Sequence, residues 1–415
     1  MRGHVRGFGE VGPGFKAYRA ASHRCRTPQD TIAHVMPFAA AFGITRIGNL
    51  TGLDRTGIPV VVVCRPNARS SAVFHGKGID LAAAKASGIM EAIETWHAEH
   101  VSLPLRFASF ADLGKSSRSA EVDRLPRIPG SHFDVDVPML WVEGRNLMDG
   151  EAVWTPFELV NAHSTINGPP ASGCFNGSTN GLASGNHILE ATSHALCELI
   201  ERDGTALWRQ SPVAEQDRRR LDLATVDDAE CLAVLDQFAR ANIEMAAWDA
   251  TTDIGVPTFQ CFAADRTGEI GHIGIGAGCH PTRKNALLRA MTEAAQVRTT
   301  YIVGSREDIQ HADYHVTTLA ARNASARALM RPVSRPRDFA SIGNFDFETF
   351  EAEVAWLVDR LRFAGIGQAI AVDLTRPEFG IPVVRVVVPG LEGFDHNPLA
   401  YAPGARARAL QERRA

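Results

Sequence analysis

Cysteine is scarce in this chain, and no two cysteines have the CxxC spacing of a metal or redox motif. The 415 residues include seven cysteines, which are scattered and mostly lie in apolar stretches of sequence. A structural zinc site or a disulfide framework normally shows cysteines at short, regular spacing. The sequence therefore predicts reduced, buried thiols.

Long apolar runs and an excess of one charge are also missing. No segment is apolar over the roughly 20 residues that a membrane-spanning helix needs, and the start of the chain lacks the apolar centre of a secretory signal. We therefore expect a cytoplasmic protein that does not bind membranes. Lys and Arg number 43 against 47 Asp and Glu, for a net charge of -4. This balance gives no electrostatic reason to expect nucleic-acid binding.

One local pattern recurs three times along the chain. A turn, Gly-Ile-Pro or Gly-Val-Pro, and a run suited to a strand occur within 51–66, 251–265 and 374–390. Proline is tolerated at the first position of a strand, so each pattern predicts a strand after its proline. The recurrence indicates related units in a chain of the α/β (α+β) class. We expect a flexible arm over 1–15, one compound domain over 16–403 and a basic tail over 404–415.

Three predicted helices carry polar side chains along one stripe of an otherwise apolar surface. The helices cover 81–98, 186–203 and 284–300, and each follows a Gly-rich segment that we expect to be flexible. Residues three or four apart lie on the same face of a helix. The stripes consist of Ser87, Glu91 and Glu94; of Glu190, His194, Glu198, Glu201 and Arg202; and of Arg289, Glu293 and Gln296.

Carboxylates set among apolar side chains need partners. Burying them costs several kcal/mol unless cations or hydrogen bonds compensate the charge. Two such helices facing each other could hold hard divalent cations such as Mg2+, which in turn could hold phosphates. A single ExxE pair is common on solvated helices, so the inference depends on the stripes occurring together. His194 could ligate a metal, although a hydrogen-bonded helix histidine is the commoner role.

Other segments have simpler interpretations. Gly76-Lys77-Gly78 lacks the following hydroxyl residue and the glycine spacing of a P-loop, so a Walker motif is excluded and a loop is predicted. The remaining apolar patterns predict packing helices over 28–42, 155–163, 225–242 and 347–364, and irregular structure over 103–135 and 303–345.

Five separated blocks together resemble the YcaO family of ATP-dependent enzymes that modify peptide backbones. In the family's order they are FKAYRAASHRCRTPQDT, ITRIGNLTGLDRTGIPV, GKGIDLAAAKASGIMEAIETWHAE, NGLASGNHILEATSHALCELIERD and ALLRAMTEAAQVR. The Lys-x-Tyr-Arg run near the N-terminus and the GLDRTGIPV block are most similar to YcaO proteins that act beside a TfuA partner. The resemblance implies mixed sheets backing helices that line an ATP site unlike a P-loop. It also allows a homodimer.

The resemblance implies a role for each residue that matches a family motif. The implied metal ligands are Glu91, Glu94, Glu198 and Glu201; the implied nucleotide contacts are Lys16, Glu94, Asn186, Glu190, Arg202, Arg289 and Glu293; and the implied catalytic residues are Glu91, Glu201, Arg202 and Arg289. A hydroxyl contact after the N-terminal lysine falls at Ser22 or His23. Ala183 replaces a small hydroxyl residue of many relatives, with Ser184 beside it.

The implied reaction is an ATP- and Mg2+-dependent change to a backbone amide of a peptide or protein. Many azoline-forming members end in Pro-x-Pro-x-Pro, whereas this chain ends in ARALQERRA, which favours thioamide formation with an external sulfur donor. The alternatives are a cyclodehydratase acting on Cys, Ser or Thr of a ribosomal peptide, and a nucleotide-binding accessory to another enzyme. Few residues precede Lys16, so we expect substrate recognition to need a separate, TfuA-like partner.

Overall fold

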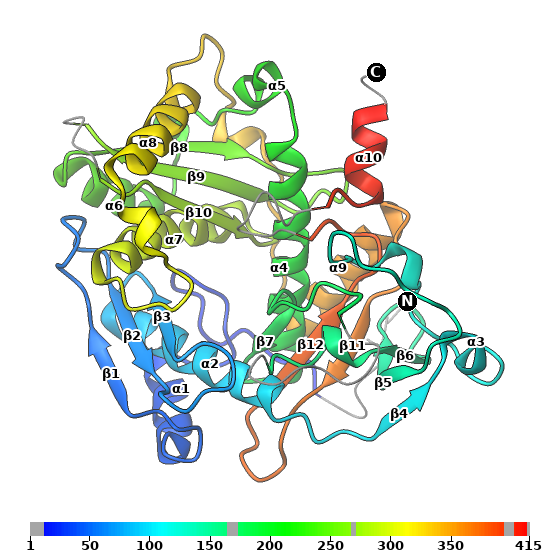
Figure 1. Cartoon of the computed structure of the whole chain (residues 1–415). Helices are drawn as coiled ribbons and strands as arrows, with labels where there is room; N and C mark the ends of the chain where they lie inside the picture. The colour runs from blue at the N-terminus through cyan, green and yellow to red at the C-terminus, as the bar shows by residue number, and fades with distance from the viewer. Residues whose placement is uncertain (1–11, 164–172, 267–270, 394–401, 413–415) are drawn as a thin grey trace.

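Three sheets and the helices between them form the described part of the chain. The structure is a computed structural model that describes residues 12–163, 173–266, 271–393 and 402–412 (Figure 1). All pairs between its named strands are antiparallel. Its helices and sheets confirm the predicted α/β (α+β) class, although the described sheets are antiparallel where the resemblance implied mixed ones.

Two of the sheets have three strands each, and the third has six. The first sheet has the order β1 (Arg46–Asn49), β2 (Val60–Cys64), β3 (Val73–Lys77). The second has the order β10 (Gly274–Cys279), β9 (Thr258–Asp265), β8 (Ile243–Asp249). The third has the order β4 (Leu105–Ala108), β5 (Met139–Asn146), β11 (Ile370–Asp373), β12 (Val383–Val387), β7 (Leu182–Ser184), with β6 (Ala152–Pro156) paired to β5. The strands β2, β9 and β12 follow Pro59, Pro257 and Pro382, as the recurring pattern predicted.

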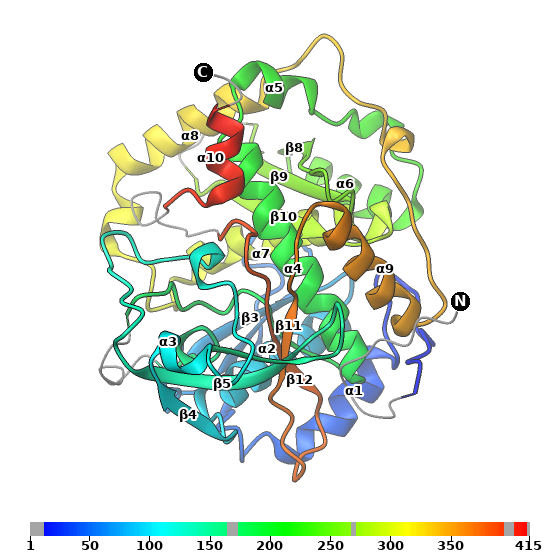
Figure 2. The same ribbon diagram turned by 90° about the vertical axis from the view of Figure 1, so that its right-hand side faces the viewer.

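Each sheet is packed against one of the three striped helices. The helix α2 (Leu81–Glu99) packs on β2 and β3, and α7 (Arg283–Val303) packs on β9 and β10. The helix α4 (Ile188–Arg209) packs on β7 and β12 and also reaches β9 and β10. In both ribbon views α4 runs through the middle of the molecule (Figures 1 and 2). The sheets therefore place the three stripes around one central helix.

The remaining helices surround this frame. The helix α1 contacts α2, α6 contacts α7 and β8, α8 contacts β9, and both α9 and α10 contact α4. Their bounds are α1 Pro28–Val35, α3 Phe110–Leu113, α5 Val213–Arg218, α6 Ala229–Arg240, α8 Val316–Met330, α9 Phe350–Phe363 and α10 Ala405–Glu412. The helices expected within 28–42, 225–242 and 347–364 are confirmed as α1, α6 and α9, although α1 ends at Val35 and a 3-10 turn, Met36–Phe38, follows it.

Two segments differ from the sequence prediction. The helix predicted over 155–163 is wrong, because this segment holds the end of β6 and a single 3-10 turn, Phe157–Leu159. The segment 303–345 was expected to be irregular but contains α8. That helix buries Leu319, Ala326 and Met330, which lie at helical spacing and are the sequence signal for it.

The Gly-rich segments before the first and third stripes are strands rather than flexible loops. Gly76 lies in β3 and Gly276 lies in β10. A Cβ atom on Gly76 would lie 2.0 Å from the carbonyl oxygen of Ala84, and one on Gly276 would lie 2.1 Å from that of Ala290. Glycine is needed at both positions because a helix backbone lies directly on each strand. This close approach holds α2 and α7 firmly in place.

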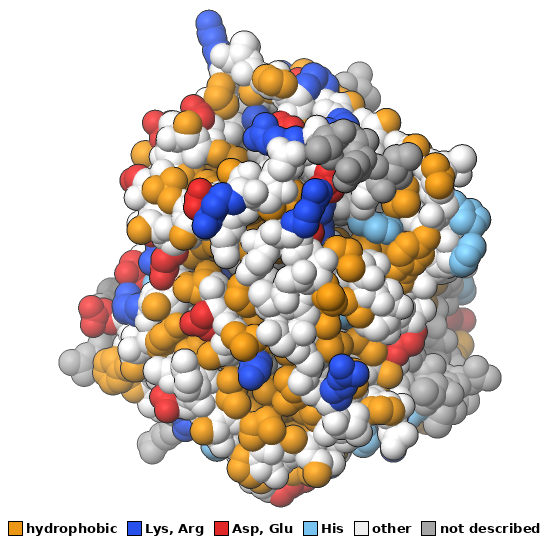
Figure 3. Space-filling view, turned by 90° about the vertical axis from the view of Figure 1, so that its left-hand side faces the viewer, with side chains coloured by type: hydrophobic (Ala, Val, Ile, Leu, Met, Phe, Trp, Pro, Cys, Tyr) orange, Lys and Arg blue, Asp and Glu red, His pale blue; other side chains and the backbone are white. Residues whose placement is uncertain are grey.

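Two findings concern the surface and the thiols. None of the described helices is both long and apolar enough to cross a membrane. On the face in Figure 3, charged side chains of both signs are scattered among apolar and uncharged ones. Cys197, Cys231, Cys261 and Cys279 are buried, as predicted, whereas Cys25, Cys64 and Cys174 are half-buried, and the described residues contain no disulfide.

The C-terminal helix α10 is attached to α4 through a buried ion pair. Arg406 Nε donates a hydrogen bond to Oδ1 of Asp203 at 2.9 Å, and the Asp203 side chain is fully buried. Arg406 also pairs with Asp253. Burial raises the pKa of Asp203 to about 6, against the opposing effect of Arg406. The segment 404–412 is therefore in contact with the helix that carries the second stripe.

We expect Arg406→Ala to lower the free energy of unfolding by about 3 kcal/mol at pH 8, because it leaves a buried carboxylate without its cation. Without Arg406 the folded-state pKa of Asp203 rises further above its unfolded value, so the loss grows as pH rises and is smaller at pH 5. Denaturant unfolding at both pH values measures it. Arg408→Ala, which changes an exposed arginine of the same helix, is the control. Equal losses at the two pH values would contradict the assignment.

Candidate active site

The three stripes bring five carboxylates into one cluster. Glu91 and Glu94 come from α2, Glu198 and Glu201 from α4, and Glu293 from α7. The charges of Glu198 and Glu293 act on both Glu91 and Glu201, and those of Glu91 and Glu198 act on Glu94. All four residues expected as metal ligands therefore lie together, and Glu293 joins them.

Glu94 is oriented by the end of β7. Its Oε2 accepts hydrogen bonds from the backbone N–H and from Oγ of Ser184, both at 2.9 Å. Ser184 Oγ also lies 3.1 Å from the backbone oxygen of Met90. Ser184 thus holds a carboxylate of the cluster, while the neighbouring Ala183 is buried in the core.

The carboxylates of α4 are oriented by backbone donors from two different sheets. The backbone N–H of Gly181, next to β7, donates to Glu198 Oε2 at 3.1 Å. The backbone N–H of Cys279, at the end of β10, donates to Glu201 Oε2 at 3.1 Å. Because backbone groups hold both carboxylates, their positions depend on the fold more than on neighbouring side chains.

Two cations lie within the acidic cluster. Arg202 is 3.4 Å from Glu198 and 3.7 Å from Glu201, and Lys77 Nζ is 2.5 Å from Glu293 Oε2. Burial lowers the pKa of Arg202, but Glu201 and Glu198 outweigh it and the net pKa is raised. The loop predicted around Lys77 is wrong. Lys77 is the last residue of β3, which contacts α7, and its side chain reaches Glu293 of the cluster.

The carboxylates carry more charge than these cations compensate. Burial, reinforced by Glu198 and Glu293, raises the pKa of Glu91 to about 7, and burial with Glu293 and Glu198 raises that of Glu201 to about 7. Burial and the charge of Glu91 raise the pKa of Glu94 well above its ordinary value. Acidic oxygen ligands in excess of their cations fit a hard divalent ion such as Mg2+.

We expect Mg2+ binding to release protons at pH 7. The pKa values of Glu91 and Glu201 are raised to about 7, so both groups retain protons there, and an added cation favours their ionised forms. Affinity should therefore rise between pH 6 and pH 8. Calorimetry in two buffers of different ionisation enthalpy measures the release. A binding enthalpy independent of buffer would contradict the raised pKa values.

A pocket next to the cluster lies between α4, α9 and the N-terminal segment. Its lining includes the expected residues Glu190, His194 and Arg289, and both Ser22 and His23. Glu190 accepts hydrogen bonds from the backbone N–H of Cys25 at 2.8 Å and from Asn186 at 3.3 Å. Burial lowers the pKa of His194 well below its usual value, so its ring is neutral.

Lys16 reaches this pocket through residues that the sequence did not single out. Its Nζ is 2.5 Å from Oε2 of Glu353, on α9, and 3.4 Å from Nδ1 of His23. Oγ of Ser193, on α4, donates to Oε1 of Glu353 at 2.5 Å. Glu353 is 1% exposed, and the ion pair with Lys16 compensates its buried charge. Sequence reasoning treated α9 as a packing element because Phe350, Val354 and Leu357 lie at helical spacing on one apolar face.

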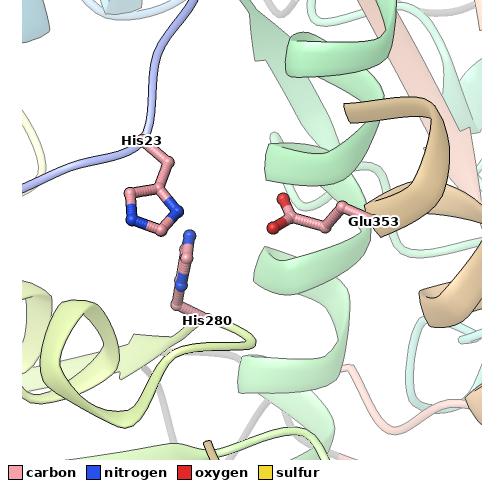
Figure 4. A group of neighbouring side chains, drawn as sticks. All are labelled: His23, His280 and Glu353. Carbon is pink, nitrogen blue, oxygen red and sulfur yellow. The ribbon is translucent and has the colours of Figure 1, made fainter. Parts of the chain in front are cut away.

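His23, His280 and Glu353 converge from three separate elements (Figure 4). Their ligand atoms lie within 4.8 Å of one another, as in a metal site. However, Nδ1 of His280 accepts from the backbone N–H of Thr282 at 2.9 Å, and Lys16 already pairs with the carboxylate of Glu353. The cluster is therefore a hydrogen-bonded network around Lys16.

Asn285, at the start of α7, is a further polar group of this pocket that sequence reasoning missed. It is 2% exposed, and neither Oδ1 nor Nδ2 has a hydrogen-bond partner among the described residues. A buried amide lacking both partners is costly. A ligand that offers one donor and one acceptor side by side would satisfy it.

Comparison with known proteins identifies relatives along most of the chain. A family model described as the ATP- and Mg2+-binding YcaO cyclodehydratase matches residues 75–392. An uncharacterized protein from the tfuA 3' region of Rhizobium leguminosarum bv. trifolii is 37% identical over 377 residues, covering 89% of this chain and 88% of that one. An uncharacterized protein of Methanothermobacter thermautotrophicus is 34% identical over 382 residues, covering 89% and 95%.

Solved structures have the same fold. The YcaO protein of Methanopyrus kandleri, bound with AMPPCP and Mg2+, superposes with a TM-score of 0.74 at 21% identity, covering 94% of this chain and 98% of that one. A heterocyclase in complex with substrate and cofactor superposes with a TM-score of 0.79 at 21% identity. The match covers 94% of this chain and 55% of the heterocyclase, so the chain spans about half the length of that protein.

Proposed function

Because this chain belongs to the YcaO family, we propose that it uses ATP and Mg2+ to modify a backbone amide of a peptide, most specifically by forming a thioamide. The observation that carries the proposal is the cluster of five carboxylates around Arg202, next to a pocket lined by Arg289 and Glu190. The YcaO family is ATP- and Mg2+-binding, and the cluster has the ligands that Mg2+ prefers.

We assign the residues of the site by their charge and position. Glu91, Glu94, Glu198 and Glu201 would hold Mg2+, which offsets phosphate charge when bound. Arg202 and Arg289 would contact the phosphates, and Lys16 would contact the nucleotide once a ligand competes for its ion pair with Glu353. Asn186, Glu190 and Glu293 complete the proposed nucleotide contacts. Arg289 is already fixed, because its Nη1 donates to the backbone oxygen of Cys279 at 3.0 Å.

The chemistry requires an amide oxygen to become a leaving group. Sulfide forms a C–S bond at the carbonyl carbon, and the resulting oxyanion takes the γ-phosphoryl group of ATP, with ADP as the other product. The C–O bond then breaks, phosphate departs, and loss of the S–H proton leaves C=S. Arg202 and Arg289 would compensate the negative charge that moves between the phosphate oxygens. The described residues need no covalent role.

Azoline formation is the second candidate, favoured by the match to a heterocyclase structure. The same activation would apply, but a Cys, Ser or Thr of the substrate would attack the carbonyl and water would be lost. The relative from a tfuA 3' region supports thioamide formation and a TfuA-like partner protein instead. An accessory role would show nucleotide binding without turnover. The homodimer stays a prediction.

The deciding experiment measures the intact mass of a peptide encoded beside the gene. The peptide is incubated with this protein, the TfuA-like protein, ATP, Mg2+ and sulfide. A mass gain equal to the exchange of oxygen for sulfur, dependent on ATP, is the expected result. Loss of one water would establish azoline formation. An unchanged peptide mass with tight AMPPCP binding would favour the accessory role.

We expect Asn285→Leu to weaken ATP binding about tenfold, because the amide would pair with a donor and an acceptor on the edge of the adenine base. Leucine has nearly the same shape, so the pocket should keep its form. Calorimetry with AMPPCP and Mg2+ measures the affinity. Inorganic triphosphate, which lacks the base, should bind the variant and the native protein equally. Equal loss for both ligands would assign Asn285 to packing alone.

A further inference from the structure

A second pocket adjoins the acidic cluster and shares no lining residue with the nucleotide pocket. It lies between α4, β12 and the segment that precedes β7, and Arg202 belongs to both its lining and the cluster. Its empty volume is about 470 Å3, including space open to solvent. The walls are mostly apolar, with Leu159, Leu199 and Leu391 among them, and Asn176 and Asn180 add amide groups.

Arg385 lines this pocket from an unusual position. It lies within β12, between the buried residues Val384 and Val386, and β12 pairs with β11 on one side and with β7 on the other. Arg385 is 3% exposed, yet Nε and Nη1 have no hydrogen-bond partner among the described residues. Buried guanidinium groups are normally paired, because removing their hydration costs several kcal/mol.

The nearest compensation comes from the acidic cluster. Burial lowers the pKa of Arg385 to about 10, and Glu198 acts in the opposite direction, so the guanidinium stays charged at neutral pH. Glu198 instead accepts its hydrogen bonds from the backbone N–H of Gly181 and from Nη2 of Arg202. The donors of Arg385 are therefore available to a ligand that lies next to Glu198.

The lining distinguishes between ligands. The lining combines apolar walls with two arginines, Arg202 and Arg385, and with the amides of Asn176 and Asn180. A peptide segment offers apolar side chains to these walls and carbonyl oxygens to these donors, whereas a phosphate group would leave the apolar walls uncovered. We propose that the second pocket binds the peptide segment containing the amide to be modified, with an oxygen of the peptide accepting hydrogen bonds from Arg385. The inference rests on the proposed function, because it places the peptide beside Arg202, next to the carboxylates that would hold Mg2+.

The test measures peptide binding apart from turnover. Two probes are used, N-acetyl-Leu-Gly-Val amide and its free acid, each titrated by NMR into the protein saturated with AMPPCP and Mg2+. We expect Arg385→Met to weaken the tighter probe at least about tenfold and to change AMPPCP affinity less than about twofold. If the free acid binds more tightly than the amide, the partner of Arg385 is a carboxylate. If the two probes bind with equal affinity, the partner is a backbone carbonyl.

Leu391→Trp, which fills the pocket without changing charge, should have the same effect, and it covers the case in which Arg385→Met fails to fold. The control is Arg362→Met, at a half-exposed arginine of α9. Unchanged peptide affinity in both pocket variants, absence of peptide binding to the native protein, or an equal loss of AMPPCP would each overturn the proposal. Arg385-dependent binding without any ATP-dependent mass change would leave this site standing and refute the proposed reaction.

Discussion

Glu201→Gln should reduce Mg2+-dependent ATP turnover on the order of 1,000-fold, the largest loss that we expect from a single substitution. Glu201 is 7% exposed, lies beside Arg202 and is oriented by the backbone of Cys279. Glutamine keeps the shape but removes the charge that would hold the metal. The measurement is steady-state ATP hydrolysis in the presence of peptide, over a range of Mg2+ concentrations.

The fold should survive this change. Burial raises the pKa of Glu201 in the folded protein to about 7, which is above its pKa in the unfolded chain. Ionisation of Glu201 therefore lowers the free energy of unfolding as the pH rises between these two pKa values. Glutamine removes that cost, so the metal-free variant should be at least as stable as the native protein at pH 8. Glu143→Gln, at an exposed position of β5, is the matched control. Native-like turnover by Glu201→Gln would rule out its assignment as a metal ligand.

Arg202→Met should lower ATP turnover by about 100-fold or more and also destabilise the metal-free protein. Arg202 is the cation that lies within 4 Å of both Glu198 and Glu201. Without it their carboxylates repel each other, and their folded-state pKa values rise further. The loss of stability should therefore increase as pH rises through about 7. Thermal unfolding between pH 5 and pH 9 measures this dependence.

Arg202→Lys separates the two roles of this residue. Lysine keeps the charge, so stability at pH 8 should be largely restored, while turnover stays low because a single ammonium group cannot replace the planar guanidinium. Restored turnover would show that only the charge matters. A stability profile of Arg202→Met that runs parallel to that of the native protein would contradict the electrostatic role.

Local spacing was enough to predict the polar stripes. Glu91 and Glu94, or Glu198 and Glu201, lie three residues apart, which places each pair on one face of its helix whatever the rest of the fold does. The strands after Pro59, Pro257 and Pro382 were predictable for the same reason, since proline restricts its own neighbourhood. Such features depend on backbone geometry over a few residues.

Partners that come from distant segments were not predictable. Glu353 meets Lys16, Lys77 meets Glu293, and Arg385 approaches Glu198 only because sheet pairing and helix packing bring them together. The immediate sequence neighbours of Glu353, Lys77 and Arg385 are apolar residues or glycines, which gave no sign of these contacts.

The sequence by itself determined which helix faces are acidic, where three of the strands begin, and the family. Only the tertiary structure decided that these faces meet around α4 and that Gly76 and Gly276 lie in strands beneath helices. It also decided that Arg385 is buried beside the site, with two donors that have no partner in the described part of the chain. The physical reason is the range of the interactions. Helical periodicity acts over a few residues, whereas the pairing of charges across sheets depends on the whole packed chain.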